Sequence, residues 1–467
     1  MNMELRHRRI LVLGMGLTGF SMLRYLLRRG AQVVIVDTRS HPPFLEKIAN
    51  FYPQVEIHCG ALRDTLFEHI DGIAISPGVD KRQPYIRQAE ANGVPLFGDI
   101  ELFAQALPEQ QKVLAVTGTN GKTTTTELTR TLCETAGYSA VAAGNIGEPV
   151  LDVLECFEGG ASFPDVLVLE LSSYQLETTH SLSPLAATVL NISENHLDRY
   201  SDIAAYVEAK THIFDRTETQ ILNINDPHVR AMKRADKQIQ YFGIADHEHE
   251  NIEQPFWCLR EHQGASWLCR NEQPLLEANR LTLVGRHNAL NALAALALTS
   301  MVVGQEDINE NVLNALQHFH GLPHRMEDVG TVHGVRYIND SKATTVTATS
   351  AALTGMNAPV ILIAGGDGKG QNFAPLTDTV AQHCRAILLI GRDASLLNDT
   401  LRAHGDKLLV ENCETLTNAM QRAHALAQAG DIVLLSPACA SLDQFDNYQA
   451  RGEAFAAIVT QFAEEEM

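Results

Sequence analysis

The stretch that decides the expected fold is Val113-Leu-Ala-Val-Thr-Gly-Thr-Asn-Gly-Lys-Thr-Thr-Thr-Thr126. A short apolar run leads into the glycine-rich segment 117–124, and a segment of helical character follows. Glycines let backbone N–H groups approach phosphate oxygens, and the N-terminus of a helix adds partial positive charge. In such a loop Lys122 reaches the terminal phosphates, and Thr123 or Thr124 offers a hydroxyl to Mg²⁺. The stretch therefore predicts a phosphate-binding loop between a buried strand and a helix.

This loop is shorter than the general phosphate-loop pattern, which has a glycine five residues before Gly121. Val116 stands at that place. Because the match is imperfect, the class of protein has to come from the rest of the chain.

Length and composition restrict the classes of protein to consider. A chain of 467 residues is expected to hold two to four domains. Its formal net charge of -20 argues against a nucleic-acid partner, which needs a broad basic face. The eight cysteines include no C-x-x-C pair, and no secretory signal or membrane-spanning apolar run is visible. We therefore expect a cytoplasmic protein with reduced thiols.

The N-terminal part has the pattern of a βαβ unit. An apolar strand at residues 9–13 is followed by Gly14-Met-Gly-Leu-Thr-Gly19, an amphipathic segment and a second strand that ends in Asp37. This G-x-G-x-x-G turn with a following acid suggests NAD when taken alone. A mononucleotide site, a sugar-nucleotide site and a tight turn without a ligand remain open. A further strand ends in Ser76-Pro-Gly78, where open α/β sheets place ligands.

A polar segment near Pro108 marks a domain boundary, and several strands after it end in polar residues. The strand at 165–170 ends in Glu170, which we interpret as a Mg²⁺ ligand rather than a surface residue. Beyond the strand at 186–191, His196 lies in a polar loop, which favours a functional role. The helical segment 204–214 carries Lys210, and nothing in the spacing distinguishes it from a solvated lysine.

Residues 246–280 contain histidines and cysteines, but their spacings match no zinc pattern. Alternation at 256–259 and 266–269 instead predicts a β-hairpin insertion. The Ala/Leu-rich segment 284–298 predicts a helix on which Asn288 and Asn291 share one face. These amides could contact an adenine or ribose edge, or Asn288 could cap the helix.

From residue 321 onward, strands again alternate with helical segments, which predicts a further parallel sheet. We therefore expect an α/β protein with three domains, at 1–107, 108–320 and 321–467, and ligands between them. A nucleotide-binding domain with two small-ligand domains suggests the ATP-driven joining of two substrates. In such a reaction a carboxylate is activated as an acyl phosphate and an amine then displaces the phosphate.

The chain resembles the Mur ligases, because nine motifs of that family occur in it in the family's order. Each motif alone is weak evidence, but the set is specific and spans nearly the whole chain. The motifs are Thr117-Gly-Thr-Asn-Gly-Lys-Thr-Thr, Gly144-Asn-Ile-Gly, Glu170-Leu-Ser-Ser-Tyr-Gln-Leu-Glu, His196-Leu-Asp-Arg-Tyr, His287-Asn-Ala-Leu-Asn, His324-Arg, Asn339-Asp-Ser-Lys-Ala-Thr, Gly365-Gly-Asp-Gly-Lys-Gly and Ser436-Pro-Ala-Cys-Ala-Ser-Leu-Asp-Gln-Phe.

The resemblance implies a role for residues in each domain. A Rossmann-like N-terminal domain would bind a UDP-sugar, a central P-loop-type ATPase domain would bind ATP and Mg²⁺, and a Rossmann-like C-terminal domain would bind the amino acid and part of ATP. The implied catalytic residues are Lys122, His196, Lys210, Lys342 and Lys369. Those for ATP are Gly118, Thr119, Asn120, Gly121, Lys122, Thr123, Thr124, Asn288, Asn291, Arg325 and Asp340. Those for the other substrates are Leu17, Thr18, Thr38, Arg39, Gly78, Asn145, His196, Thr344, Lys369, Ser441, Leu442 and Tyr448. Those for two Mg²⁺ ions are Thr123, Glu170, His196 and, as a carbamate, Lys210.

The resemblance also implies a reaction. A monomeric cytoplasmic ligase would add D-glutamate to UDP-N-acetylmuramoyl-L-alanine, through an acyl phosphate and a tetrahedral intermediate, in peptidoglycan precursor synthesis. Tyr448 departs from the phenylalanine expected near the amino-acid site. The alternatives are another Mur-type or folylpolyglutamate-type ligase, an NAD-dependent dehydrogenase and a non-catalytic ATP-gated module.

Overall fold

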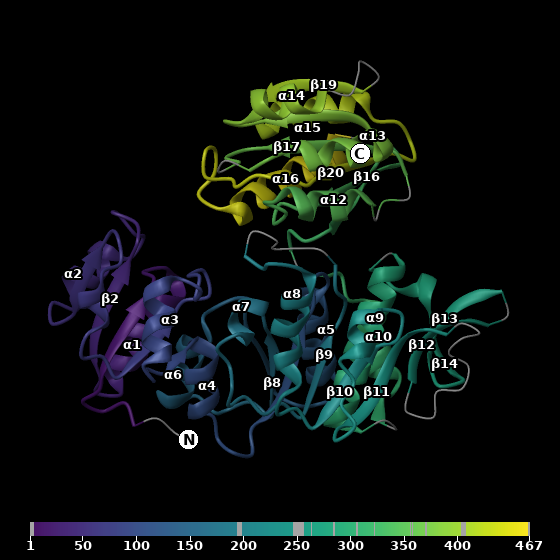
Figure 1. The fold of residues 1–467 in the computed structure, drawn as a ribbon. Helices are drawn as coiled ribbons and strands as arrows, with labels where there is room; N and C mark the ends of the chain where they lie inside the picture. Colours follow the sequence, from purple (N-terminus) through teal and green to yellow (C-terminus); the bar gives the residue numbers. More distant parts are fainter. Residues whose placement is uncertain are drawn as a thin grey trace. The chain divides into compact units, whose positions relative to one another are not determined.

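The computed structural model describes residues 4–193, 199–245, 256–262, 264–283, 285–304, 307–321, 323–354, 356, 358–368, 371–402 and 408–465. The chain divides into two compact units, residues 1–319 and 320–467. The strands of the described residues form three sheets, two in the first unit and one in the second (Figure 1). The α/β class with parallel sheets, expected from the sequence, is confirmed.

The N-terminal sheet has the strand order β3-β2-β1-β4-β5, and its neighbouring strands run parallel. The apolar residues of β1 and β2 are buried on both faces, as expected for a parallel sheet covered by helices. The strands are β1 (Arg9–Leu13), β2 (Gln32–Asp37), β3 (Glu56–Cys59), β4 (Gly72–Ile75) and β5 (Leu96–Phe97). The helices are α1 (Leu17–Arg28), α2 (Leu45–Phe51), α3 (Pro84–Ala91) and α4 (Asp99–Ala106).

The central sheet has the order β14-β13-β12-β11-β10-β9-β6-β8-β7. Its strands are β6 (Lys112–Thr117), β7 (Ala140–Gly144), β8 (Val166–Glu170), β9 (Ala186–Val189), β10 (Thr219–Asn223), β11 (Gln238–Ile244), β12 (Phe256–His262), β13 (Ala265–Arg270) and β14 (Gln273–Glu277). Its helices are α5 (Lys122–Thr135), α6 (Val150–Glu158), α7 (Ser173–Leu176), α8 (Ile203–Thr211), α9 (Pro227–Ala231), α10 (Arg286–Val303) and α11 (Glu310–Gln317). Parallel β8 and β9 flank β6, so their carboxyl ends meet beside the phosphate-loop segment.

The core of this domain forms where α10 packs against α5, β11 and β12. The alanines and leucines of α10 are buried almost all round, as expected for a helix enclosed by its neighbours. The hairpin expected from the sequence is confirmed, because β12 and β13 pair antiparallel. It is not a separate insertion: β12 continues the sheet by pairing parallel with β11, as Figure 1 shows at the edge of this domain.

The sheet of the second unit has the order β15-β16-β20-β17-β18-β19. Its neighbouring strands run parallel except for β15, which pairs antiparallel with β16. The strands are β15 (Glu327–Val332), β16 (Val335–Asn339), β17 (Val360–Gly365), β18 (Cys384–Ile390), β19 (Leu409–Glu414) and β20 (Ile432–Leu435). The helices are α12 (Val346–Thr354), α13 (Thr377–His383), α14 (Ala394–Arg402), α15 (Leu416–Leu426) and α16 (Tyr448–Glu465).

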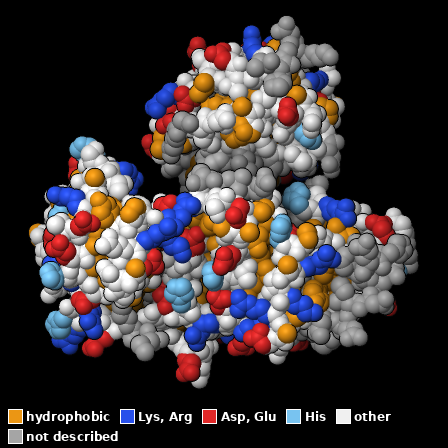
Figure 2. All heavy atoms as spheres, in the orientation of Figure 1, with side chains coloured by type: hydrophobic (Ala, Val, Ile, Leu, Met, Phe, Trp, Pro, Cys, Tyr) orange, Lys and Arg blue, Asp and Glu red, His pale blue; other side chains and the backbone are white. Residues whose placement is uncertain are grey.

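The surface shown in Figure 2 carries basic and acidic side chains interspersed with each other. Among the described helices, none combines the length and apolar character needed to cross a membrane.

Candidate active site

The phosphate-loop segment joins β6 to α5 through two glycines in the left-handed region. Gly118 has φ +148° and Gly121, at the N-cap of α5, has φ +82°. A Cβ atom at Gly118 would lie 3.0 Å from Leu190, and one at Gly121 would collide with the Asn291 amide. Glycine is therefore required at both places by conformation and by space. The same contact brings Asn291, on α10, to the start of α5.

Lys122 bends back over the loop that it follows. Its Nζ donates hydrogen bonds to the carbonyl oxygens of Gly118, at 3.1 Å, and Thr119, at 2.9 Å. Asn191, just past β9, holds the loop from the other side, since its side chain bonds the N–H and the carbonyl of Asn120 at 2.9 and 3.1 Å. Thr123 is buried in the first turn of α5 and Thr124 is half-buried. The arrangement suits the binding of a polyphosphate at a helix N-terminus.

Lys210 on α8 is only 1% exposed, so its interpretation from spacing alone as a solvated lysine is wrong. Its Nζ donates to the carbonyl of Gly118 at 3.0 Å and to Oγ1 of Thr117 at 3.2 Å, and it lies over the Tyr206 ring. Burial lowers the pKa of Lys210 well below its usual value, and the charge of Lys122 lowers it further, while Glu170 opposes both. Burial therefore disfavours the ammonium form of Lys210 beside the phosphate loop.

Glu170 ends β8 and is 2% exposed, which excludes the surface interpretation. Its Oε1 accepts a hydrogen bond from Nδ2 of Asn145 at 2.8 Å, whereas its Oε2 is buried without a partner among the described residues. A buried carboxylate oxygen without a partner is costly unless a ligand satisfies it. Carboxylates and hydroxyls are the ligands that Mg²⁺ prefers, so Glu170 and Thr123 fit that ion. The described residues contain no cluster of three or more His, Cys, Asp or Glu side chains placed to bind a metal.

The N-terminal candidate site brings the turn at 14–19 against the end of β4. A Cβ atom at Gly14, where φ is +99°, would lie 2.8 Å from Oγ of Ser76. Gly78 is exposed and has open space where a Cβ atom would stand. The other residues of this domain predicted to contact the sugar nucleotide are also accessible: Thr18 is half-buried, and Leu17, Thr38 and Arg39 are exposed.

Asp37 is the acid whose position suggested NAD. Both of its carboxylate oxygens accept hydrogen bonds from groups of the protein itself. It accepts hydrogen bonds from the backbone N–H groups of Met15 and Arg39, at 2.7 and 2.9 Å, and from the Arg39 guanidinium. Burial opposes ionisation, but these bonds outweigh it and lower the pKa of Asp37 to about 2. A carboxylate occupied in this way does not offer its oxygens to a ribose, which disfavours the dinucleotide interpretation.

In the second unit, Asp340 follows β16 and is 7% exposed. Burial raises the pKa of Asp340 to about 7, although Ser436 donates to its Oδ2 at 2.8 Å. Its Oδ1 accepts from the backbone N–H of Met326 at 3.3 Å, and Arg325, beside it in the chain, is half-buried. Arg325 and Asp340 therefore lie close together. The resemblance implies that both contact ATP.

The described residues predicted for the amino-acid site come from two loops of this unit and from the start of a helix. Lys342 and Thr344 follow β16, Ser441 and Leu442 follow β20, and Tyr448 begins α16. Ser441 is buried, whereas Leu442 is 60% exposed. Lys369 and His196 lie outside the described residues.

Sequence reasoning missed Arg451 on α16, which is 1% exposed. Its guanidinium donates to the hydroxyl and carbonyl of Ser341, at 3.0 and 2.8 Å, and to the carbonyl of Cys439 at 3.1 Å. It thereby joins the loops that carry Lys342 and Ser441. A single arginine on an amphipathic helix gives no sequence signal of such a role.

Among the described residues, the first unit gathers Lys122, Thr123, Lys210, Glu170, Asn145 and Asn291 around the end of β6. Asn288 lies one turn of α10 from Asn291 and accepts a hydrogen bond from it at 3.3 Å. The N-cap of α10 is Gly285, so the alternative that Asn288 caps this helix is wrong.

Three domain families match the chain in order. The MurD-like N-terminal domain of Mur ligases matches residues 8–98, the Mur ligase middle domain matches 116–299, and the Mur ligase glutamate ligase domain matches 324–439. The chain belongs to the Mur ligase family. It is therefore an enzyme of the ligase class, and the resemblance seen in the motifs is confirmed.

Curated relatives of this Mur ligase share its full length. The protein named UDP-N-acetylmuramoylalanine--D-glutamate ligase in Methylobacillus flagellatus is 47% identical over 466 residues, which cover 100% of this chain and 99% of the relative. The protein of that name in Nitrosomonas europaea is 46% identical, over 97% of this chain and 96% of the relative.

Solved Mur ligase structures share the fold at lower identity. UDP-N-acetylmuramate-alanine ligase MurC from Thermotoga maritima has a TM-score of 0.55 and 19% identity, over 97% of this chain and 100% of that chain. A pseudomurein peptide ligase type C from Methanothermus fervidus has a TM-score of 0.56 and 19% identity, over 97% of this chain and 100% of that chain. These similarities confirm the three-domain α/β fold expected from the sequence.

Proposed function

We propose that this protein is an ATP-dependent, ADP-forming ligase that joins D-glutamate to UDP-N-acetylmuramoyl-L-alanine. The observation that carries the proposal is the 47% identity, over the whole chain, to a ligase named for those two substrates. The phosphate loop beside Lys210 and Glu170 supports ATP-driven chemistry in particular. We further propose a monomeric cytoplasmic enzyme of peptidoglycan precursor synthesis.

The reaction has two steps. The L-alanyl carboxylate of the sugar nucleotide attacks the γ-phosphorus of ATP, which forms an acyl phosphate and releases ADP. The amine of D-glutamate then adds to the acyl carbon, and the tetrahedral intermediate expels phosphate and loses a proton to leave the amide. Because carboxylates and phosphates are all anionic, the protein has to bring like charges together and neutralise them.

Residues of the phosphate loop would neutralise the negative charge of the ATP phosphates. The backbone N–H groups of residues 118–124 and the ammonium of Lys122 would bind the phosphates. Asn288, Asn291, Arg325 and Asp340 would contact ATP, as the resemblance implies.

Thr123, Glu170 and His196 would bind Mg²⁺, with Lys210 as a further ligand after carbamylation. When bound, the ion neutralises charge on the transferred phosphoryl group. Carbamylation is a reaction of a neutral amine with CO₂ that releases one proton and forms an N–C bond. The buried side chain of Lys210 is suited to it, since burial disfavours the ammonium.

The other substrates would be held mainly by the outer two domains, with Asn145 of the central domain also at the sugar nucleotide. Leu17, Thr18, Thr38, Arg39, Gly78 and Asn145 would contact the sugar nucleotide. Lys342, Thr344, Lys369, Ser441, Leu442 and Tyr448 would hold D-glutamate and the reacting carboxylate. We place the domain boundaries at 1–107, 108–320 and 321–467, and the first boundary falls between α4 and β6.

An ATP-dependent assay of phosphate release tests the function. The protein is supplied with UDP-N-acetylmuramoyl-L-alanine, ATP and Mg²⁺, and with D-glutamate, L-lysine or meso-diaminopimelate. We expect release only with D-glutamate, and none when ATP or the sugar nucleotide is omitted. Equal turnover with another amino acid would refute the substrate assignment and favour a different Mur-type or folylpolyglutamate-type ligase.

A further inference from the structure

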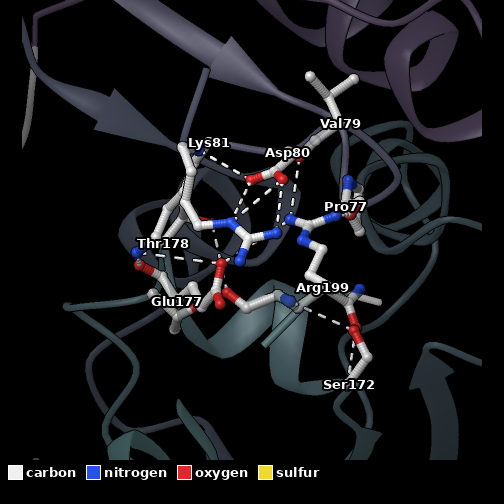
Figure 3. A network of polar contacts seen from close by, with 11 residues as sticks. Pro77, Val79, Asp80, Lys81, Ser172, Glu177, Thr178 and Arg199 are labelled. Atoms are coloured by element: carbon white, nitrogen blue, oxygen red, sulfur yellow. Dashed lines mark hydrogen bonds and ion pairs between the residues drawn. The ribbon is translucent and has the colours of Figure 1, made fainter. Parts of the chain in front are cut away.

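Arg199 links the turn after β4 of the N-terminal domain to the region of α7 in the central domain (Figure 3). Its Nη1 donates to the carbonyl oxygen of Pro77 and its Nη2 to that of Val79, both at 3.0 Å. These two carbonyls flank Gly78 in the turn that follows β4. The planar guanidinium has its donors in a fixed fork, so two bonds to carbonyls two residues apart fix the shape of the turn.

The other side of the Arg199 guanidinium is held by the central domain. Its Cζ lies 4.1 Å from the centroid of the Tyr174 ring, and its Nη2 lies 3.8 Å from Oε2 of Glu177. The side chains of Arg199 and Glu177 are only 11% and 12% exposed, so water screens this charge pair weakly. Lys81 adds a second link, because its Nζ donates to the carbonyl of Glu177 at 3.3 Å.

The turn that Arg199 holds belongs to the N-terminal candidate site. Ser76 packs against Gly14, so the turn and the loop at 14–19 are in contact. The position of Gly78 is open where a side chain would stand, which leaves its backbone accessible to a ligand. Arg199 therefore supports the turn from the side of the central domain and leaves Gly78 exposed.

A row of aromatic rings continues from Arg199 toward the phosphate loop. The Tyr174 and Tyr200 rings are stacked with centroids 6.0 Å apart, and Tyr200 lies 5.3 Å from Tyr206. The hydroxyl of Tyr206 lies 3.3 Å from Oγ1 of Thr119, within the phosphate loop. Contiguous packing thus joins the turn at Gly78 to the nucleotide site.

We propose that Arg199 is a positioning residue for the sugar nucleotide. It fixes the Pro77–Val79 turn against Tyr174 and Glu177, so that the sugar nucleotide is bound at the correct distance from the phosphate loop. The inference rests on the proposed function, because it assumes that the turn binds a sugar nucleotide. A displacement of about 1 Å in a bound reactant is enough to lower a reaction rate strongly.

Calorimetric binding tests the inference without turnover. UDP-N-acetylmuramoyl-L-alanine is titrated into the full chain in the presence of a non-hydrolysable ATP analogue, and the analogue is titrated separately. We expect Arg199→Met to raise the Kd of the sugar nucleotide by about tenfold or more, because two charge-assisted hydrogen bonds are lost. We expect Arg199→Lys to fall between it and the wild type, since an ammonium cannot reproduce the planar fork. The Kd of the ATP analogue should change less than about threefold, since the contacts of Arg199 within the described part of the chain do not include the phosphate loop.

Arg28→Ala is the matched control. Arg28 on α1 pairs with Glu155 on α6 at 2.8 Å, so it joins the same two domains at a place remote from the turn. Its removal should leave the Kd of the sugar nucleotide unchanged. An equal loss in Arg28→Ala, an unchanged Kd in Arg199→Met, or a parallel loss of both ligands would overturn the proposal. If the wild type itself does not bind UDP-N-acetylmuramoyl-L-alanine, the proposed function fails instead.

Discussion

The Nζ atom of Lys342 lies 4.0 Å from the centroid of the Tyr448 ring. The two residues come from different elements, the loop after β16 and the start of α16. The backbone of Tyr448 is held as well, since the hydroxyl of Ser341 donates to its carbonyl oxygen at 2.8 Å. An aromatic ring thus positions a lysine that we assign to the amino-acid site, and a phenylalanine would offer the same face.

The first prediction follows from this contact. Tyr448→Phe should leave the KM for D-glutamate within about twofold of the wild type, because the ring face is kept. Tyr448→Leu should raise that KM about three- to tenfold, since the cation–π contact is lost. Steady-state kinetics with D-glutamate as the varied substrate measures both. Equal losses in the two variants would show that the hydroxyl, and not the ring, matters.

The second prediction concerns Lys122, whose Nζ lies over the phosphate loop. Lys122→Ala should lower kcat at least about 100-fold, because a preorganised positive charge at the transferred phosphoryl group is lost. The Kd of the sugar nucleotide should stay within about threefold, since the contact is made to phosphate. Lys112→Ala is the control, because Lys112 is exposed at the start of β6. A loss of sugar-nucleotide binding as large as the loss in kcat would contradict the assigned role.

The third prediction concerns Lys210. Its pKa is lowered in the folded state, so the unfolded chain binds more protons and stability rises with pH up to the usual lysine pKa. Lys210→Met removes this cost and should raise Tm at pH 7, with a smaller gain near pH 10, while ligase turnover is lost. Thermal unfolding at the two pH values and the phosphate-release assay measure the two effects. A Tm lowered at both pH values would mean that the bonds of Nζ to Gly118 and Thr117 outweigh the cost of burial.

Local sequence patterns predicted the parts of the site that lie on one strand and the loop after it. The phosphate loop, the end of β8 at Glu170 and the helix with Asn288 and Asn291 all follow from patterns within about 15 residues. In each case the alternation of apolar strand and polar loop specifies where the side chain stands along its own sheet.

Contacts between distant segments could not be predicted in this way. Arg199 lies 122 residues from Pro77, and the bond between Asn145 and Glu170 joins separate strand ends. The burial of Lys210 likewise depends on how α8 packs on the end of β6, and its own helix carries no signal of it. Only the resemblance to a family pointed to Lys210 and Asn145, and nothing pointed to the bridge made by Arg199.

The last prediction uses two carboxylates of α4 that respond to pH in opposite directions. Burial raises the pKa of Asp99 to about 6, and its Oδ1 has no partner among the described residues. Burial also acts on Glu101, but its bonds from Ser181 and the N–H of His180 outweigh burial and lower its pKa. Between pH 3.8 and about 6, the folded chain therefore keeps a proton on Asp99 that the unfolded chain has released. For Glu101, the unfolded chain keeps its proton to a higher pH than the folded chain does.

Asp99→Asn should raise Tm relative to the wild type, by a margin that grows from about pH 4 to the folded pKa of about 6 and is constant above it. Glu101→Gln should lower Tm, because its carboxylate contributes stability above the unfolded pKa and loses it as pH falls through the lowered folded pKa. Each variant is the control for the other, since both remove one carboxylate from the same helix. Thermal unfolding between pH 4 and pH 8 measures the two differences. Parallel pH profiles with the same sign would show that the net charge of the protein, and not the surroundings of each carboxylate, governs the response.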